Sequence, residues 1–159
     1  MGPILSDRVS MGRLPDWPAR LARHILDATD RVFEYGVHDC SVFAADGVVA
    51  ITGRDPIACA RGRYHDEKRA AVVLREIGGM GVPEAADRLM AEFGAPPVHP
   101  AFAQRGDLVL IDAPVLSGKR DWCMGLIAPD GRVAVAAPRG LAFFSPRAAA
   151  RAWSIGGAV

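Results

Sequence analysis

The hydrophobic pattern of the chain changes its period near Gly106, and this change restricts the fold more than any other feature of the sequence. Before it, apolar residues recur at helical spacing; after it, short apolar runs alternate with turn residues. Helices followed by strands are typical of an α+β fold, in which N-terminal helices pack on a C-terminal antiparallel β-sheet. The length of 159 residues suits one domain. We therefore expect a single domain over 1–159, with a helical part at about 16–94 and a sheet part at about 106–155.

Four helices are expected in the first part, each bounded by residues that cap or stop a helix. They run from Trp17 to Ala28 after a cap at Asp16, from Cys40 to a stop at Gly53, from Asp66 to Ile77, and from Pro83 to Gly94. The second helix is the most apolar and follows Asp39, a residue type that favours the N-cap position. We expect this helix to lie at the centre of the domain.

Five strands are expected in the second part. They are Asp107–Ile111, Trp122–Ala128, Arg132–Ala137, Leu141–Phe144 and Ala152–Ile155. The turn residues Pro129-Asp130-Gly131 join the second and third of these runs into a hairpin. Asp112–Arg120 is predicted to be a loop, and the three prolines within Ala95–Pro100 indicate an extended connector.

Charge and cysteine content narrow the classes of function. With 19 basic and 18 acidic residues the formal net charge is +1, which is not the basic surplus of a nucleic-acid-binding protein. Three cysteines, Cys40, Cys59 and Cys123, cannot form a closed disulfide framework, so we expect folding in a reducing compartment. Residues 1–12 lack the apolar stretch of a signal peptide, and no run reaches the roughly 20 apolar residues of a membrane helix. We expect no nucleic-acid partner, no membrane span, and assembly in the cytoplasm.

The stretch from Phe33 to Ser41 is the most informative for chemistry. It places Cys40 in the first turn of the most apolar helix, directly after a loop that contains Gly36. Unpaired N–H groups and the helix dipole favour a thiolate at such a position, and the same N–H groups can receive an oxyanion. The alternative is that Cys40 packs in the core, because free cysteine is among the most buried residue types. Spacing alone leaves both interpretations open, since one cysteine does not locate a base.

Several motifs together resemble the NlpC-like thiol peptidases, a superfamily with a papain-like fold. They are Asp39-Cys40-Ser41 at a helix start, Gly106-Asp107-Leu108 at a strand start, and a hairpin with Met124-Gly125-Leu126 and Asp130-Gly131-Arg132-Val133. The resemblance covers about residues 16–155. More narrowly, Asp39–Pro56 and the ending Arg151-Ala152-Trp153 resemble a family of small phage tail proteins related to these peptidases.

The resemblance implies a role for each aligned position. Cys40 takes the place of the nucleophile, which attacks an amide of a peptidoglycan stem peptide. The base, a histidine on the second strand, aligns with Cys123. The polar residue that orients this histidine falls near Val135 or Ala136, and the tyrosine of the loop before the nucleophile falls at Phe33. Three parts of the family's machinery are therefore replaced in this chain.

The resemblance and these replacements together lead to three expectations. Without a general base, Cys40 should react with alkylating agents no faster than an ordinary thiol. If Cys123 occupies the position of the base, its sulfur should lie close to that of Cys40, as a near contact or a disulfide. The loop residues Phe33, Tyr35 and Gly36 correspond to a substrate loop.

Two further arrangements remain open. His38, two residues before Cys40, is the best alternative base and reaches the sulfur only if the loop folds back; His24, His65 and His99 are weaker candidates on a helix rim, a surface and a connector. A zinc site of His38, Cys40, Cys59 and His65 has suitable ligand types, but its spacing matches no standard finger. We expect neither a metal nor a cofactor.

We expect a structural component of a phage tail tip, or of a related gene-transfer particle, that keeps a peptidase fold with a degenerate active site. Its partners would be other tail-tip or baseplate proteins and peptidoglycan, and its location the particle tail. The alternative is an active thiol hydrolase that cleaves stem peptides during genome delivery. The replaced histidine favours the first function, and the retained Asp39-Cys40-Ser41 helix start favours the second.

Overall fold

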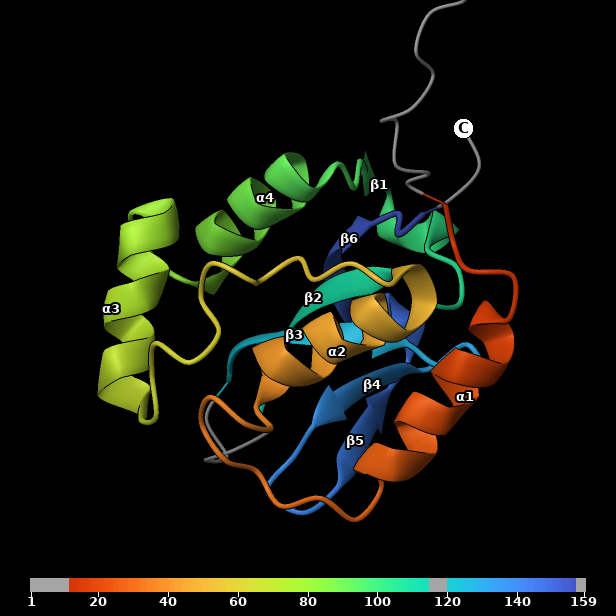
Figure 1. The fold of residues 1–159 in the computed structure, drawn as a ribbon, viewed down its shortest axis with the longest axis horizontal. Coiled ribbons are helices and arrows are strands. Elements are labelled where there is room, and N and C mark those ends of the chain that lie inside the picture. The colour runs from red at the N-terminus through yellow and green to blue at the C-terminus, as the bar shows by residue number, and fades with distance from the viewer. Residues whose placement is uncertain (1–11, 115–119, 157–159) are drawn as a thin grey trace, which may run out of the picture.

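The structure, a computed structural model, describes residues 12–114 and 120–156. Over these residues the chain is α+β, with four α-helices and one six-stranded antiparallel sheet (Figure 1). The helices are α1 (Trp17–Ala28), α2 (Cys40–Thr52), α3 (Glu67–Gly78) and α4 (Val82–Phe93). The strands are β1 (Pro97–Val98), β2 (Leu108–Ala113), β3 (Asp121–Ile127), β4 (Val133–Ala136), β5 (Leu141–Phe144) and β6 (Ala149–Trp153). Residues 1–11 of the segment tested for a signal peptide, and residues 115–119 of the expected loop, lie outside the described residues.

The helix boundaries follow the capping residues that predicted them. Asp39 caps α2 by accepting a hydrogen bond from the Val42 N–H, and Gly53 ends the helix with a φ of 76°. Asp66 caps α3 in the same way. Asp16 occupies the N-cap position of α1, as expected, but its side chain makes no cap hydrogen bond; its carboxylate instead accepts one from Arg20 Nε at 2.8 Å.

Three expectations for the strands need correction. β2 continues through Ala113, so the first two residues of the expected loop belong to the sheet. β6 spans Ala149–Trp153, so it begins three residues and ends two residues before the expected strand. Its early start arises because pairing with β2 makes a strand of an alanine-rich segment that has little β-propensity. The connector contains a short strand, β1, in which Pro97 pairs with Trp153.

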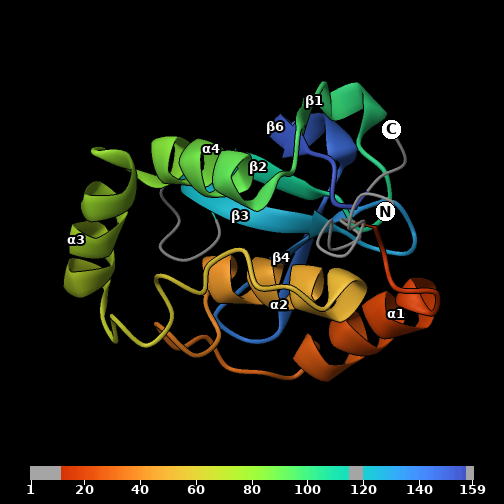
Figure 2. The ribbon, with the colours of Figure 1, turned by 45° about the horizontal axis from the view of Figure 1, so that its top comes forward.

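The strand order is β1-β6-β2-β3-β4-β5. Helix α2 packs on β3 and β4 with α1 beside it, and α3 packs on α4. Figures 1 and 2 both show α3 at the opposite end of the molecule from α1. Helices α2, α3 and α4 all contribute residues to the lining of a cavity that is described below.

Two hydrophobic clusters involve the sheet. In the first, Phe43 and Val48 of α2 pack with Leu126, and Gly47 permits the close approach, since a Cβ there would lie 2.6 Å from Leu126 Cδ2. The second cluster uses the alternate residues of the strands. It contains Val109, Ile111, Ala113, Cys123, Ile127, Val133, Val135 and Ala152, with Cys40 packed against it. The start of α2 thus contacts the cluster to which Cys123 belongs.

Asp107 of the Gly-Asp-Leu motif has a structural role. It is 3% exposed, and its Oδ1 accepts hydrogen bonds from Arg13 Nη2 and from the Ile155 N–H, both at 3.0 Å. Its Oδ2 accepts a third, from the Gln104 N–H at 2.8 Å. One buried carboxylate thereby joins the N-terminal segment, the turn before β2 and the end of β6.

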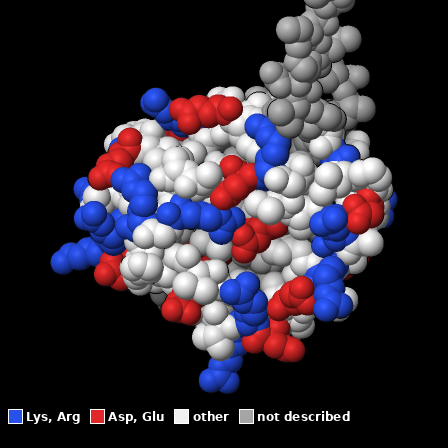
Figure 3. All heavy atoms as spheres, viewed as in Figure 1, with Lys and Arg blue, Asp and Glu red and all other residues white. Residues whose placement is uncertain are grey.

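The surface carries both signs of charge, as Figure 3 shows for one face. Arg61 contacts Asp46 and Asp55, and Arg63 contacts Glu76. The side chains of both arginines remain partly exposed to solvent. No helix among the described residues is long and apolar enough to span a membrane.

Candidate functional site

The loop before α2 is held by the carboxylate of Asp39, which is 3% exposed. Its Oδ1 accepts the N–H of Val42 at 2.8 Å, and its Oδ2 accepts the N–H of Gly36 at 2.8 Å. The hydroxyl of Tyr64, in the segment between α2 and α3, donates to the same Oδ2 at 2.6 Å. One side chain therefore caps the helix, closes the loop and ties both to a segment more than 20 residues away in sequence.

Gly36 has to be glycine at this turn. Its φ of 81° lies in the left-handed region, and a Cβ there would lie 2.2 Å from the carbonyl oxygen of Tyr64. The two flanking aromatic residues of the predicted substrate loop, Phe33 and Tyr35, contact each other edge to face with ring centroids 5.0 Å apart. Both line the cavity described below.

Cys40 is the first residue of α2 and is half-buried. Its pKa is lowered, first by the interaction with the neighbouring Cys123 thiol, then by the backbone N–H of Met124 and the hydroxyl of Ser41, while burial and Asp39 act in the opposite direction. The Ser41 Oγ lies 3.9 Å from the Cys40 Sγ. A lowered pKa means a larger thiolate fraction of Cys40 at a given pH and argues against the expectation of an ordinary thiol, which stays a prediction for alkylation rates to test.

Cys123 lies near the start of β3 and is 5% exposed. Its pKa is raised, mainly by Cys40, then by burial and by the charges of Asp121 and Asp112. In the described part of the chain β3 pairs with β4 only at Leu126 and Ile127, whereas the beginning of β3 pairs with β2, and helix α2 packs on β3. The two cysteines are free thiols, so the expected disulfide is not formed; both line one cavity, and Cys40 packs against the hydrophobic cluster that contains Cys123.

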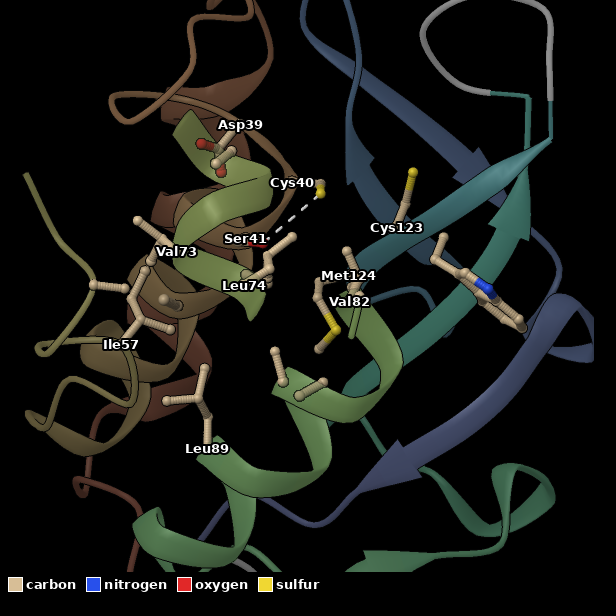
Figure 4. A pocket seen from close by; sticks show the side chains of 18 of the residues that line it. Asp39, Cys40, Ser41, Ile57, Val73, Leu74, Val82, Leu89, Cys123 and Met124 are labelled. Carbon is tan, nitrogen blue, oxygen red and sulfur yellow. Dashed lines mark hydrogen bonds between the residues drawn. The ribbon is translucent and has the colours of Figure 1, made fainter. Parts of the chain in front are cut away.

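A cavity of about 440 Å³ opens beside these thiols. Figure 4 shows Cys40 and Cys123 at one end, contributed by α2 and β3, and Ile57 and Leu89 at the other. Most of the wall is aliphatic. The charged residues among its described lining are Asp39, Glu67 and Asp121, and no histidine, lysine or arginine belongs to that lining.

His38 does not reach this cavity. It is 1% exposed and lies edge-on to Phe43 with ring centroids 6.0 Å apart. Its Nε2 finds no hydrogen-bond partner among the described residues. Burial, followed by the charge of Arg31, lowers its pKa. The fold-back that would bring this imidazole to Cys40 is therefore not the conformation of the loop.

The other candidate bases and ligands are dispersed. His24 is partly buried and its Nε2 lies 2.9 Å from the Phe43 carbonyl oxygen, while His65 and His99 are exposed. Cys59 is exposed and does not line the cavity. Among residues 12–114 and 120–156, no three His, Cys, Asp or Glu side chains gather closely enough to hold a metal ion.

Two contributors to the site were missed by the reasoning from sequence. Tyr64 carries no local pattern, and only the fold brings its hydroxyl to Asp39. Met124 acts through its backbone N–H, which no side-chain motif reveals. The position beside Val135 and Ala136, where an orienting residue was expected, contains only buried apolar side chains.

A family model described as a domain of unknown function (DUF6950) matches residues 12–155, which is most of the chain. The chain therefore belongs to this family. No curated protein matches the sequence.

Proposed function

We propose that this member of the DUF6950 family is a non-hydrolytic domain of the NlpC type that serves as a structural component of a phage tail tip or gene-transfer particle. The observation that carries the proposal is the identity of the side chain beside Cys40, which is the thiol of Cys123. The described lining of the cavity also contains no histidine. Loss of general acid–base assistance typically costs 10²–10⁴ in rate.

The arrangement of the elements supports the kinship with papain-like enzymes. A cysteine starts the central helix, this helix packs on an antiparallel sheet, and the helix start contacts the beginning of β3. Asp39 and Tyr64 preserve a rigid loop ahead of Cys40, although the chemistry that such a loop serves has lost its base. A fold kept in this way can present docking surfaces to tail-tip or baseplate proteins and to peptidoglycan in the particle tail, after assembly in the bacterial cytoplasm.

An active thiol hydrolase is the second candidate. The lowered pKa of Cys40 and its position at the cavity favour this function, because a thiolate beside a cleft is the starting point of amide cleavage. It needs a proton donor for the leaving amine, and Cys123, whose pKa is raised, is the titratable thiol beside Cys40.

Incubation with purified peptidoglycan separates the two candidates. The wild-type protein and the Cys40→Ala variant should release the same background of stem peptides, measured by chromatography and mass spectrometry. Release that depends on Cys40 would overturn the non-hydrolytic proposal. The structural role is tested separately, because purified particles of the producing strain should contain the chain in fixed stoichiometry to other tail proteins, and its absence would contradict that role.

A further inference from the structure

We propose that Cys40 and Cys123 form a reactive dithiol that exchanges with disulfides carrying an apolar, uncharged or cationic group, with Cys40 as the attacking thiolate and Cys123 as the resolving thiol. This activity goes beyond the structural role and does not require it. The geometry that points to it is that two free thiols from different elements, α2 and β3, line the same end of one cavity (Figure 4).

The two thiols have different environments, and the difference agrees with the roles of Cys40 as attacking thiolate and Cys123 as resolving thiol. Cys40 is half-buried at the N-terminus of a 13-residue helix. Its pKa is lowered first by Cys123 and then by the Met124 N–H and the Ser41 hydroxyl. Cys123 is 5% exposed and retains its proton because the charge of Cys40 and its own burial raise its pKa. An incoming disulfide is therefore attacked by the Cys40 thiolate, while the Cys123 thiol stays protonated until the second step.

The exchange proceeds in two balanced steps. The Cys40 thiolate attacks one sulfur of the substrate, forms a mixed disulfide, and expels the second sulfur as a thiolate that takes a proton from water. Cys123 then loses its proton, attacks the Cys40 Sγ, and releases the remaining substrate thiol. The protein dithiol is oxidised by two electrons and the substrate disulfide is reduced to two thiols. An external dithiol such as dithiothreitol restores the reduced protein.

The same coupling drives the second step. Once Cys40 is in a mixed disulfide its negative charge is gone, and the main factor that raises the pKa of Cys123 is removed. Cys123 therefore becomes a better nucleophile at the moment when an electrophilic sulfur lies beside it.

The cavity defines the class of disulfide. Its wall beyond the thiols is aliphatic, with Val73, Leu74, Val82 and Leu89 among its residues. Its described charged residues are all carboxylates, including the exposed Glu67 and Asp121. An apolar group fits this wall, whereas an anionic substrate meets charges of its own sign.

The test uses the full chain in a Cys59→Ser background, because the exposed Cys59 lies outside the cavity and would add an unrelated signal. The probe is 4,4′-dithiodipyridine, a neutral aromatic disulfide whose released thiol is coloured. The protein should release two equivalents of thiol and lose the mass of two hydrogen atoms, with peptide mapping locating a Cys40–Cys123 disulfide.

Two matched variants assign the steps. With Cys123→Ser in this background, one equivalent is released and the probe remains on Cys40; Cys123→Ala should behave alike, and circular dichroism confirms that both are folded. With Cys40→Ser, the charge of Cys40 no longer raises the pKa of Cys123, but Cys123 is 5% exposed, so this remaining thiol should still react more slowly than Cys40 does. Two stable mixed disulfides on one chain, or a Cys40 that reacts no faster than Cys59 in the wild-type protein, would overturn the dithiol activity.

The substrate class is tested by comparing cystamine, which is cationic, with glutathione disulfide, which is anionic. Cystamine should oxidise the pair faster, and Asp121→Asn should narrow the difference. Equal rates for both disulfides would overturn the assignment of the ligand class. Failure of these exchange assays is distinct from failure of the proposed function, which depends on the release of stem peptides.

Discussion

The hydroxyl of Tyr64 donates a 2.6 Å hydrogen bond to Asp39 Oδ2, and both residues are buried. This contact links the segment that follows α2 to the N-cap of the same helix. The carboxylate also accepts the N–H groups of Gly36 and Val42, so the position of Cys40 depends on a small polar network rather than on apolar packing alone. The contribution of this polar network to the free energy of unfolding can be measured with single substitutions.

The first prediction concerns Tyr64→Phe. The variant removes a buried hydrogen bond to a carboxylate and should lower the free energy of unfolding by about 1.5–3 kcal/mol, measured by chemical denaturation. Tyr35→Phe is the matched control, because the Tyr35 side chain is half-buried and its hydroxyl donates no hydrogen bond within the described residues. The control should change stability by less than about 0.5 kcal/mol. Equal effects of the two substitutions would contradict the role given to Tyr64.

The second prediction compares two glycines with similar backbone conformations. Gly36 and Gly62 have φ values of 81° and 76°, but a Cβ at Gly36 would meet the Tyr64 carbonyl oxygen at 2.2 Å, whereas one at Gly62 would meet nothing within 4 Å. Gly62→Ala should cost about 1–2 kcal/mol from backbone strain alone. Gly36→Ala should cost clearly more in the same denaturation experiment, and equal costs would show that the close approach of the two segments is not maintained in solution.

The third prediction concerns the pH dependence of stability. Burial, and after it the charge of Arg31, lowers the pKa of His38. The charges of Asp39 and Asp46 raise this pKa, and the charge of His24 lowers it. The unfolded chain therefore binds more protons than the folded chain near the ordinary histidine pKa of about 6.5, so stability should fall as the pH decreases from about 7.5 to about 5.5.

His38→Leu tests this assignment, because it removes the titrating group together with an Nε2 that has no partner in the described part of the chain. The variant should lose less stability than wild type over the same pH interval. A residual slope should remain from His24, whose pKa is also lowered by burial. The same slope in variant and wild type would exclude His38 as a contributor.

Local signals in the sequence were sufficient for most of the fold. The ends of α2 could be predicted because Asp39 and Gly53 are short-range capping residues whose geometry depends on a few neighbours. The start of β6 could not, because Ala149 becomes a strand residue only through its pairing with Ile111 of β2. Strand pairing is a long-range property, whereas propensity is read from neighbours in sequence.

The residues of the candidate site also fall into two groups: those that the local sequence predicts, and those that only the fold brings together. The position of Cys40 at a helix N-terminus follows from the sequence itself. Its neighbour Cys123 was expected only from the resemblance to a family, and the contact with Tyr64 was not expected at all, since 25 residues separate it from Asp39. The lowered pKa of Cys40 depends on both kinds of contact, local from Ser41 and distant from Cys123 and Met124. Reasoning from the sequence alone could not include the distant contacts.

The central claim is that the thiol of Cys123, and not an imidazole, determines the ionisation of Cys40. The direct measurement is the rate of alkylation of Cys40 by iodoacetamide as a function of pH, in the Cys59→Ser background, with and without Cys123→Ala. Because the neighbouring thiol is the largest factor that lowers the pKa of Cys40, its removal should shift the midpoint of the profile to higher pH, and Cys123→Ser should shift it less. A midpoint that is the same in all three proteins would contradict the account.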